Sequence, residues 1–185
     1  MKNIFLCLLL LGIVSCQSVG VIESSDPRTK INDGYRMLND NRTIPALRLF
    51  NEANEIINQG SDELLKAQSF LALGDVYKFK GAGSSSEVTY SFQKAVDSYQ
   101  AAALIFLKLK LNQKLSITFW GLAQTYAQEK NNEKTCEFIN KAAKAYYDPS
   151  GSETDRAEPS VLSKVIAYFQ DSKSKNFKTV CGSKP

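Results

Sequence analysis

The sequence predicts an all-α fold, a short solenoid of three helix pairs followed by a C-terminal capping helix. The clearest evidence is residues 116–147, where apolar side chains from Phe119 to Tyr126 recur at helical spacing. Asn131 and Asn132 interrupt this pattern before a second helical stretch begins. Two helices joined by a short polar turn form an antiparallel pair. The same spacing of small and large residues occurs twice more upstream, which indicates an internal repeat.

The repeat consists of small residues and one large residue. The first and third copies have the same spacing, and the second has nine extra residues between its two halves. The three copies carry Gly34, Ala46, Phe50 and Ala53, then Gly74, Ala95, Tyr99 and Ala102, and then Ala123, Thr135, Ile139 and Ala142. Small residues let two helices approach closely, and the large side chain fills the adjoining space. A repeat of this size is typical of a helical solenoid.

This spacing resembles the tetratricopeptide repeat family, in which Leu-Gly-x2-Tyr is followed by Ala-x3-Phe-x2-Ala. Residues 73–77 match the first half, and residues 46–53 and 95–102 match the second. The third copy departs at its alanine and aromatic positions, and the repeats are longer than the usual 34 or so residues. The resemblance implies a right-handed solenoid. With the capping helix, we expect this TPR-like domain to cover residues 28–171.

The first residues predict a lipoprotein signal peptide. A lysine precedes an apolar run over residues 4–14, which is too short to span a bilayer and fits the core of a secretion signal. Residues 13–16, Ile-Val-Ser-Cys, resemble the bacterial lipobox. This implies cleavage before Cys16 and lipid, such as palmitate, on the mature N-terminal cysteine. We therefore expect a signal peptide at 1–15 and a lipidated tether at 16–27. The alternatives are a plain signal peptide with an incidental cysteine and an uncleaved anchor.

The expected anchor determines the expected location. Two or more acyl chains hold a protein stably at a membrane surface. Residues 17–27 span at most about 40 Å, so the domain would lie near the bilayer. Gln17 stands where an aspartate retains enterobacterial lipoproteins at the inner membrane. The resemblance therefore favours the outer membrane within the cell envelope.

The first helix pair is predicted from its turn and capping residues. A helix over residues 29–39 is followed by an Asn-Asp-Asn turn signal at 39–41. Thr43 is a favourable N-cap for the second helix, and Pro45 is tolerated in its first turn. Gly60 is expected to close that helix.

The middle pair contains extra residues between its two halves. Its first helix is expected to start at Ser61 or Asp62 and to end at Gly81. The stretch that follows, residues 81–87, can be a flexible inserted loop. It can also begin a longer second helix.

We favour the longer helix. Ser84 and Glu87 have the spacing of a capping box, and apolar residues continue at helical period after it. The predicted helix covers residues 85–110 and projects beyond the stack. Its tip, which holds Val88, Tyr90 and Phe92, would fold onto neighbouring residues or form part of a docking surface.

The C-terminal region is predicted as a loop, a helix and a tail. Residues 148–158 are polar, and Pro159 opens an apolar helical pattern that runs to about residue 171. A helix of this kind covers the open end of a solenoid. The tail over residues 172–185 is rich in Lys and Ser, and we expect it to be flexible.

Two cysteines remain after Cys7 and Cys16 are assigned to the signal and the anchor. Export would place Cys136 and Cys181 in an oxidising compartment, where they can pair. A bond would join the tail to the last repeat. Cys136 can equally be a buried small apolar residue on its helix, so the sequence leaves the pairing open.

Composition argues against several functional classes. The chain has 185 residues, no histidine and a formal net charge of +4, with its charges dispersed. Absence of histidine removes histidine-based triads and metal ligands. Residues 81–84 form a lone glycine-rich turn without the lysine of a phosphate loop. We therefore expect no enzyme activity, no cofactor, no metal site and no nucleic-acid partner.

The resemblance implies a binding face, because the first helix of each TPR pair lines the concave side. By register, the expected partner-binding residues are Tyr35, Leu38, Leu71, Asp75, Lys78, Phe79, Trp120 and Gln124. Trp120 is the best single anchor, since aromatic residues dominate interface hot spots. It can also pack against the terminal helix. The clamp with which some family members hold acidic C-terminal peptides is not matched here.

These features together predict a non-enzymatic lipoprotein that acts as a TPR-type scaffold for protein partners in the cell envelope, as an accessory of an envelope assembly complex. An alternative is a lipoprotein associated with TRAP-type transporters that relays a small apolar ligand. A third is an inert envelope or surface antigen.

Overall fold

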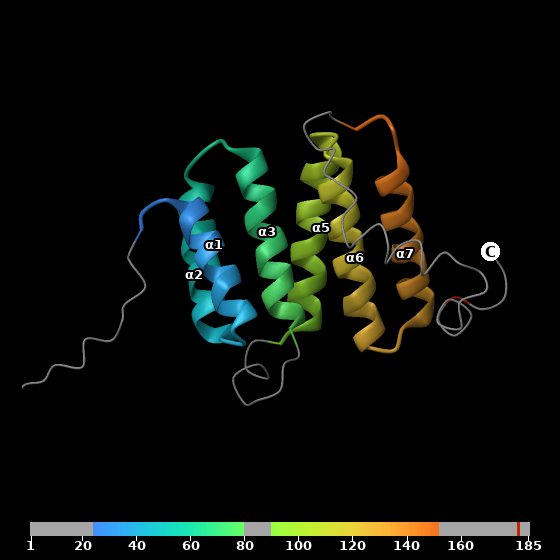
Figure 1. Ribbon diagram of the computed structural model, residues 1–185, viewed down its shortest axis with the longest axis horizontal. Helices are drawn as coiled ribbons and strands as arrows, with labels where there is room; N and C mark the ends of the chain where they lie inside the picture. The colour runs from blue at the N-terminus through green and yellow to red at the C-terminus, as the bar shows by residue number, and fades with distance from the viewer. Residues whose placement is uncertain (1–23, 80–89, 152–180, 182–185) are drawn as a thin grey trace, which may run out of the picture.

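The computed structural model of the chain describes residues 24–79, 90–151 and Cys181. Residues 24–79 and 90–151 form six α-helices and no β-strand, which confirms the all-α prediction. In chain order the helices are α1 (Pro27–Asn39), α2 (Thr43–Asn58), α3 (Glu63–Lys78), α5 (Phe92–Lys108), α6 (Asn112–Gln128) and α7 (Asn132–Tyr147). Their axes run roughly parallel to one another in a single row of packed pairs (Figure 1).

Helices that follow one another in the chain also pack together. The closest packing is within pairs: α1 against α2, α3 against α5, and α6 against α7. Successive pairs meet mainly through α2 and α3 and through α5 and α6. The first helices α1, α3 and α6 also contact one another in that order, so they lie along one face of the stack.

Three of the turns share one backbone conformation. Asn41, Lys110 and Lys130 follow α1, α5 and α6 and have φ angles of 60°, 55° and 56°. The next amide in each turn reaches back five residues: Arg42 N donates to Met37 O, Leu111 N to Phe106 O, and Asn131 N to Tyr126 O. This bond and the left-handed residue are the marks of a Schellman-type helix end. The sequence predicted the turns at 39–41 and 131–132, but not the geometry that all three turns share.

The first pair begins differently from the prediction. α1 starts at Pro27, two residues early, because the Asp26 side chain accepts hydrogen bonds from the amides of Arg28 and Thr29. Pro is favourable in a first turn that is capped in this way. The predicted cap at Thr43 is wrong: Arg42 is the N-cap of α2, and Thr43 is completely buried inside the helix.

The predicted long helix over residues 85–110 is also wrong, because Tyr90 and Ser91 are not helical. Ser91 is extended, its amide donates to Tyr77 O over 2.9 Å, and its hydroxyl caps α5 by accepting from Lys94 N. This link to the end of α3 fixes the chain and starts the helix at Phe92. The capping box at Ser84 and Glu87 lies outside the described residues.

The tip residues that the structure describes do not project. The hydroxyl of Tyr90 donates to Glu129, and the ring of Phe92 packs edge-on against Tyr126 with the ring centroids 5.3 Å apart. α3 ends at Lys78 rather than at Gly81. Both sides of this connection therefore pack against the stack as far as they are described.

The remaining predicted elements lie outside the described residues. They are the signal peptide at 1–15, most of the tether at 16–27, the capping helix that opens at Pro159, and nearly all of the tail at 172–185.

Glycines and aromatic rings hold the pairs together as the repeat pattern predicted. A Cβ placed on Gly34 would lie 2.3 Å from the ring of Phe50, and one on Gly74 would lie 2.7 Å from the ring of Tyr99. Both rings are completely buried. Burial of one large apolar side chain stabilises a fold by about 2 kcal/mol. The absence of a side chain at each glycine therefore leaves the space that the ring occupies.

Cys136 and Cys181 are joined by a disulfide, with their Cα atoms 5.1 Å apart. Cys136 lies in the first half of α7. The sequence had left this pairing open. The bond closes a loop across a sequence separation of 45 residues and fixes Cys181 beside the last helix pair.

Candidate first-helix binding face

The expected partner-binding residues all lie on or directly after the first helices of the three pairs. α1 carries Tyr35 and Leu38, α3 carries Leu71, Asp75 and Lys78 and is followed by Phe79, and α6 carries Trp120 and Gln124. We call the side of the stack formed by α1, α3 and α6 the first-helix face.

A hydrogen-bond network on this face connects all three pairs through Asp75. Tyr35 and Tyr99 donate their hydroxyls to the two Asp75 carboxylate oxygens, over 3.0 and 2.6 Å. Lys78 Nζ donates to Asp75 Oδ1 over 3.2 Å and to Gln124 Oε1 over 2.9 Å. The ammonium also lies 5.6 Å from the centre of the Tyr99 ring. The network therefore joins α1, α3, α5 and α6.

The two phenols of the network stay protonated at neutral pH. Burial raises the pKa of Tyr99 and of Tyr35 well above the usual tyrosine value, and the negative charge of Asp75 raises both further. Tyr99 is completely buried, whereas Tyr35 is only partly buried. Protonated phenols are the hydrogen-bond donors that a buried carboxylate requires.

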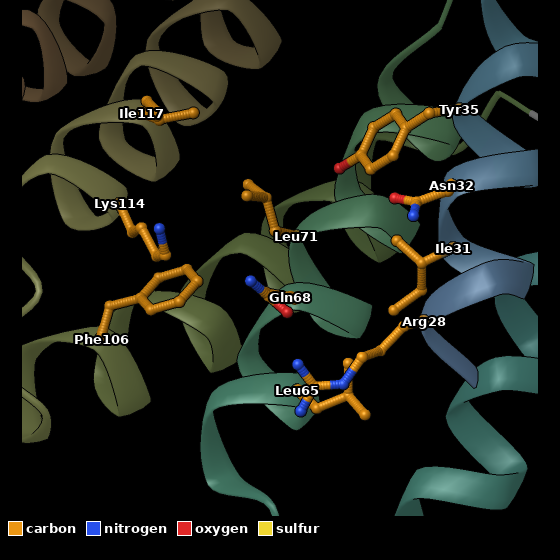
Figure 2. Close-up of a pocket in the computed structure, with 10 residues that line it drawn as sticks. All are labelled: Arg28, Ile31, Asn32, Tyr35, Leu65, Gln68, Leu71, Phe106, Lys114 and Ile117. Atoms are coloured by element: carbon orange, nitrogen blue, oxygen red, sulfur yellow. The ribbon is translucent and has the colours of Figure 1, made fainter. Parts of the chain in front are cut away.

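A cleft of about 380 Å³ lies beside this network. We call it the first-helix cleft. Figure 2 shows Lys114 and Ile117 of α6 on one side, residues of α1 on the other, and Gln68 and Leu71 of α3 between them. The described residues that line it are Arg28, Ile31, Asn32, Tyr35, Leu65, Gln68, Leu71, Phe106, Lys114 and Ile117.

Only two of the eight expected residues line this cleft, Tyr35 and Leu71. Three others, Asp75, Lys78 and Gln124, belong to the network. The structure thus brings five expected residues into one connected region of the face.

The other three expected residues pack into the protein interior to different extents. Leu38 is buried in the core of the first pair, and Phe79 packs partly buried against the same core. Trp120 is partly buried against Ala142 and Ala143 of α7. None of these three lines the first-helix cleft.

Sequence reasoning missed the polar part of the cleft. Arg28, Gln68 and Lys114 each lie three residues before an apolar side chain of the cleft, namely Ile31, Leu71 and Ile117. Residues three apart on a helix share a face. Extension of the predicted stripe by one or two turns toward each helix start would have found them. Phe106 comes from α5, and no register rule for first helices could have included it.

The described residues contain no group of three or more His, Cys, Asp or Glu side chains placed to hold a metal ion. In the same part of the chain, no helix has the length and apolar character needed to cross a membrane. Among its described lining residues, the first-helix cleft has two cations, two amides and five apolar side chains. That set of groups is suited to binding.

No protein-family model, curated protein or solved structure matches this sequence. A function for this chain is therefore inferred from its own residues.

Proposed function

We propose that the chain is a membrane-anchored bacterial lipoprotein that acts as a TPR-type protein–protein interaction scaffold in the cell envelope, as an accessory of an envelope assembly complex. The lipobox-like residues 13–16 support the anchor, and the outer membrane is the favoured location. Pairwise packing in chain order, with Gly34 against Phe50 and Gly74 against Tyr99, supports the right-handed TPR-like solenoid. A solenoid uses an extended face for partner binding.

The observation that carries this proposal is the combination of rigidity and exposure on the first-helix face. The Asp75 network ties together the helices that form the face, so its shape is maintained before a partner arrives. Ile117, at the edge of the cleft, is 45% exposed although it is a large apolar residue. Preorganised faces with exposed apolar residues favour association, because less ordering is required on binding.

A site-specific cross-linking experiment tests the partner face. A photoreactive phenylalanine analogue replaces Ile117 in the full chain, and a matched variant carries it at Leu104 on α5, which is 70% exposed. The proposal expects a discrete protein adduct in envelope preparations from Ile117 and not from Leu104. It also expects Leu71→Arg to abolish this adduct without loss of helicity. Equal adducts from both positions would remove the first-helix face from the interaction.

A separate experiment tests the anchor. Cys16→Ala should abolish acylation and release the chain from the membrane fraction, because this change removes the thiol that would carry the lipid. Cys7→Ala is the matched control, since it changes a cysteine of the same N-terminal region that the lipobox-like motif does not include. Fatty acid in the Cys16→Ala protein, measured by mass spectrometry, would contradict the proposal.

A second candidate function is the relay of a small ligand, as in the lipoproteins associated with TRAP-type transporters. The specific observation in its favour is the first-helix cleft, because its volume of about 380 Å³ lies within the range of small-molecule sites. The two candidates differ in whether this cleft holds a small molecule or a side chain of a protein partner.

A further inference from the structure

The side of α5 that faces the next helix pair has a counterpart on α7. Four buried residues of α5 lie on one side of that helix and share core clusters with residues of α6: Val96, Tyr99, Ala103 and Phe106. In the repeat, Ala102 of α5 corresponds to Ala142 of α7. The counterparts on α7 are therefore Cys136, Ile139, Ala143 and Tyr146. We call this side the outer face of α7.

Among the described helices, none follows α7 to cover its outer face. This helix ends the row of described helices (Figure 1), and α6 is the only one of them that packs closely against it. Ile139 and Ala143 are nevertheless only 1% exposed, and Tyr146 is partly buried. On α5 the same positions are buried in clusters shared with the pair that follows. The outer face of α7 therefore has the character of a helix-packing surface.

The chain leaves the last pair at one end of α7 and returns to it near the other. After α7, Gly151 lies against Asn112, the first residue of α6: a Cβ on Gly151 would lie 2.9 Å from the Asn112 Nδ2 atom. The return is at Cys181, whose disulfide joins it to Cys136 on the outer face. The helical rise places Cys136 about 16 Å from Tyr147 along α7. Residues 152–180 therefore start and end on the same helix pair.

The sequence between these two points contains a stripe that needs an apolar surface. At helical spacing, one side of the segment 159–171 carries Val161, Leu162, Val165, Ile166 and Phe169, and Ala167 lies opposite. At 1.5 Å per residue, a helix of this length spans about 20 Å, which suits the distance to be covered along α7. Such a stripe gains free energy when it is removed from water. The outer face of α7 lies within its reach and has the matching character.

We infer that residues 159–171 bind along the outer face of α7, antiparallel to α7, and that the Cys136–Cys181 bond secures them there. The sequence predicted a capping helix, and the positions of Gly151 and Cys181 assign it a surface and a direction. A second copy of the chain or a partner protein is disfavoured as the occupant, because a segment tethered at both ends has a far higher local concentration than a separate molecule. The inference goes beyond the proposed function and does not depend on it.

Intramolecular photo-cross-linking of the purified full chain tests the inference. A photoreactive phenylalanine analogue replaces Tyr146 on the outer face, and a matched variant carries it at Leu104 on α5, which is 70% exposed. After digestion with trypsin, the Tyr146 variant should give a link between residues 145–156 and either 157–164 or 165–173 of the same chain, and the Leu104 variant should not. A link between two chains, no link from Tyr146, or the same link from Leu104 would overturn the inference.

Fluorescence of Trp120 gives a second measurement in the native protein. Trp120 is the only tryptophan of the chain, and together with Tyr146 it packs against Ala143 of the outer face. Val165→Asp should raise acrylamide quenching of Trp120 by about twofold, because a charge cannot be buried in an apolar contact without a partner. Ala167→Asp, on the opposite side of the segment, should leave quenching unchanged.

Circular dichroism checks that both variants keep the helices of the wild type. Equal quenching in the wild type and in Val165→Asp would overturn the inference. Loss of the protein adduct at Ile117, with the intramolecular link from Tyr146 intact, would reject only the scaffold.

Discussion

The ring of Tyr99 occupies the space that a side chain at Gly74 would fill: a Cβ on Gly74 would lie 2.7 Å from two carbon atoms of that ring. The same ring also meets Gly121, where a Cβ would lie 2.6 Å away. Tyr99 therefore packs its own pair, α3 and α5, and the next pair, through α6. Its hydroxyl continues into the Asp75 network, so one residue connects the core to the first-helix face.

Gly74→Ala should destabilise the protein although alanine is the better helix former. The added methyl group overlaps a ring that is closely packed, because the ring also contacts Gly121 and its hydroxyl is bonded to Asp75. Overpacking of this kind costs about 1–3 kcal/mol, and the clash here is severe enough to exceed the gain in helix propensity of about 1 kcal/mol. Urea denaturation measures the difference. Gly60→Ala is the control, since its nearest atom is 3.6 Å away. Equal stability of the two variants would contradict the packing described here.

Tyr99→Phe should cost about 1–3 kcal/mol of unfolding free energy, because it removes a hydrogen bond to a carboxylate and keeps the ring. The bond to Asp75 Oδ1 is 2.6 Å long and is made by a completely buried residue. Tyr147→Phe is the matched control at a phenol that is 57% exposed, and it should change stability little. A wild-type unfolding curve for Tyr99→Phe would show that the network contributes nothing to stability.

Stability should fall at alkaline pH in a way that depends on Tyr99. Burial, together with the charge of Asp75, raises the pKa of this phenol well above its usual value. Above pH about 10 the unfolded chain has lost a proton that the folded chain keeps, so the equilibrium shifts toward unfolding. Below that pH the contribution is fully present. Absorbance of tyrosinate should show that at least one of the eight tyrosines ionises only as the protein unfolds. Tyr99→Phe should reduce the amplitude of that late step, and Tyr35→Phe should reduce it as well, because burial and Asp75 raise the pKa of both phenols. An unchanged amplitude in Tyr99→Phe would assign the step elsewhere.

Lys110→Gly should stabilise the protein by about 1 kcal/mol. Lys110 has a φ of 55°, a conformation that is strained for a residue with a β carbon and free of strain for glycine. Thermal unfolding measures the gain. Lys144→Gly, within α7, replaces a lysine in ordinary helical conformation and should lower stability by a similar amount. A loss in both variants would mean that the turn after α5 does not adopt the described conformation.

Reduction of the Cys136–Cys181 bond should lower stability, by up to about 4 kcal/mol for a loop of this length. Cys136→Ser and Cys181→Ser should each show the same loss, and the double variant should show no more. A reductant should shift the melting temperature of the wild type and leave the double variant unchanged. Peptide mapping without reduction gives a direct check, since recovery of both cysteines as alkylated free thiols would contradict the bond.

Much of the helical fold could be predicted because its signals are local. Asn131 and Asn132 marked the break between α6 and α7. The recurrence of a small residue such as Gly74 on one helix and a large residue such as Tyr99 on the next indicated which helices pack together. The start of α5 could not be found this way. Ser91 begins the helix because its amide bonds to Tyr77 O at the end of α3, and this contact exists only once α3 is in place.

The sequence by itself determined the helical class, the order of the pairs and the small residues at which helices meet, because each depends on spacing along one helix. Tertiary structure decided the rest. It brought Asp75, Tyr99 and Gln124 from three helices into one network, and it placed Phe106 of α5 beside Lys114 of α6 in the cleft. Such contacts depend on how far each helix is rotated and shifted against its neighbour. Those displacements follow from the fit of side chains across helices, as at Gly74, Tyr99 and Gly121, and no single stretch of sequence contains them.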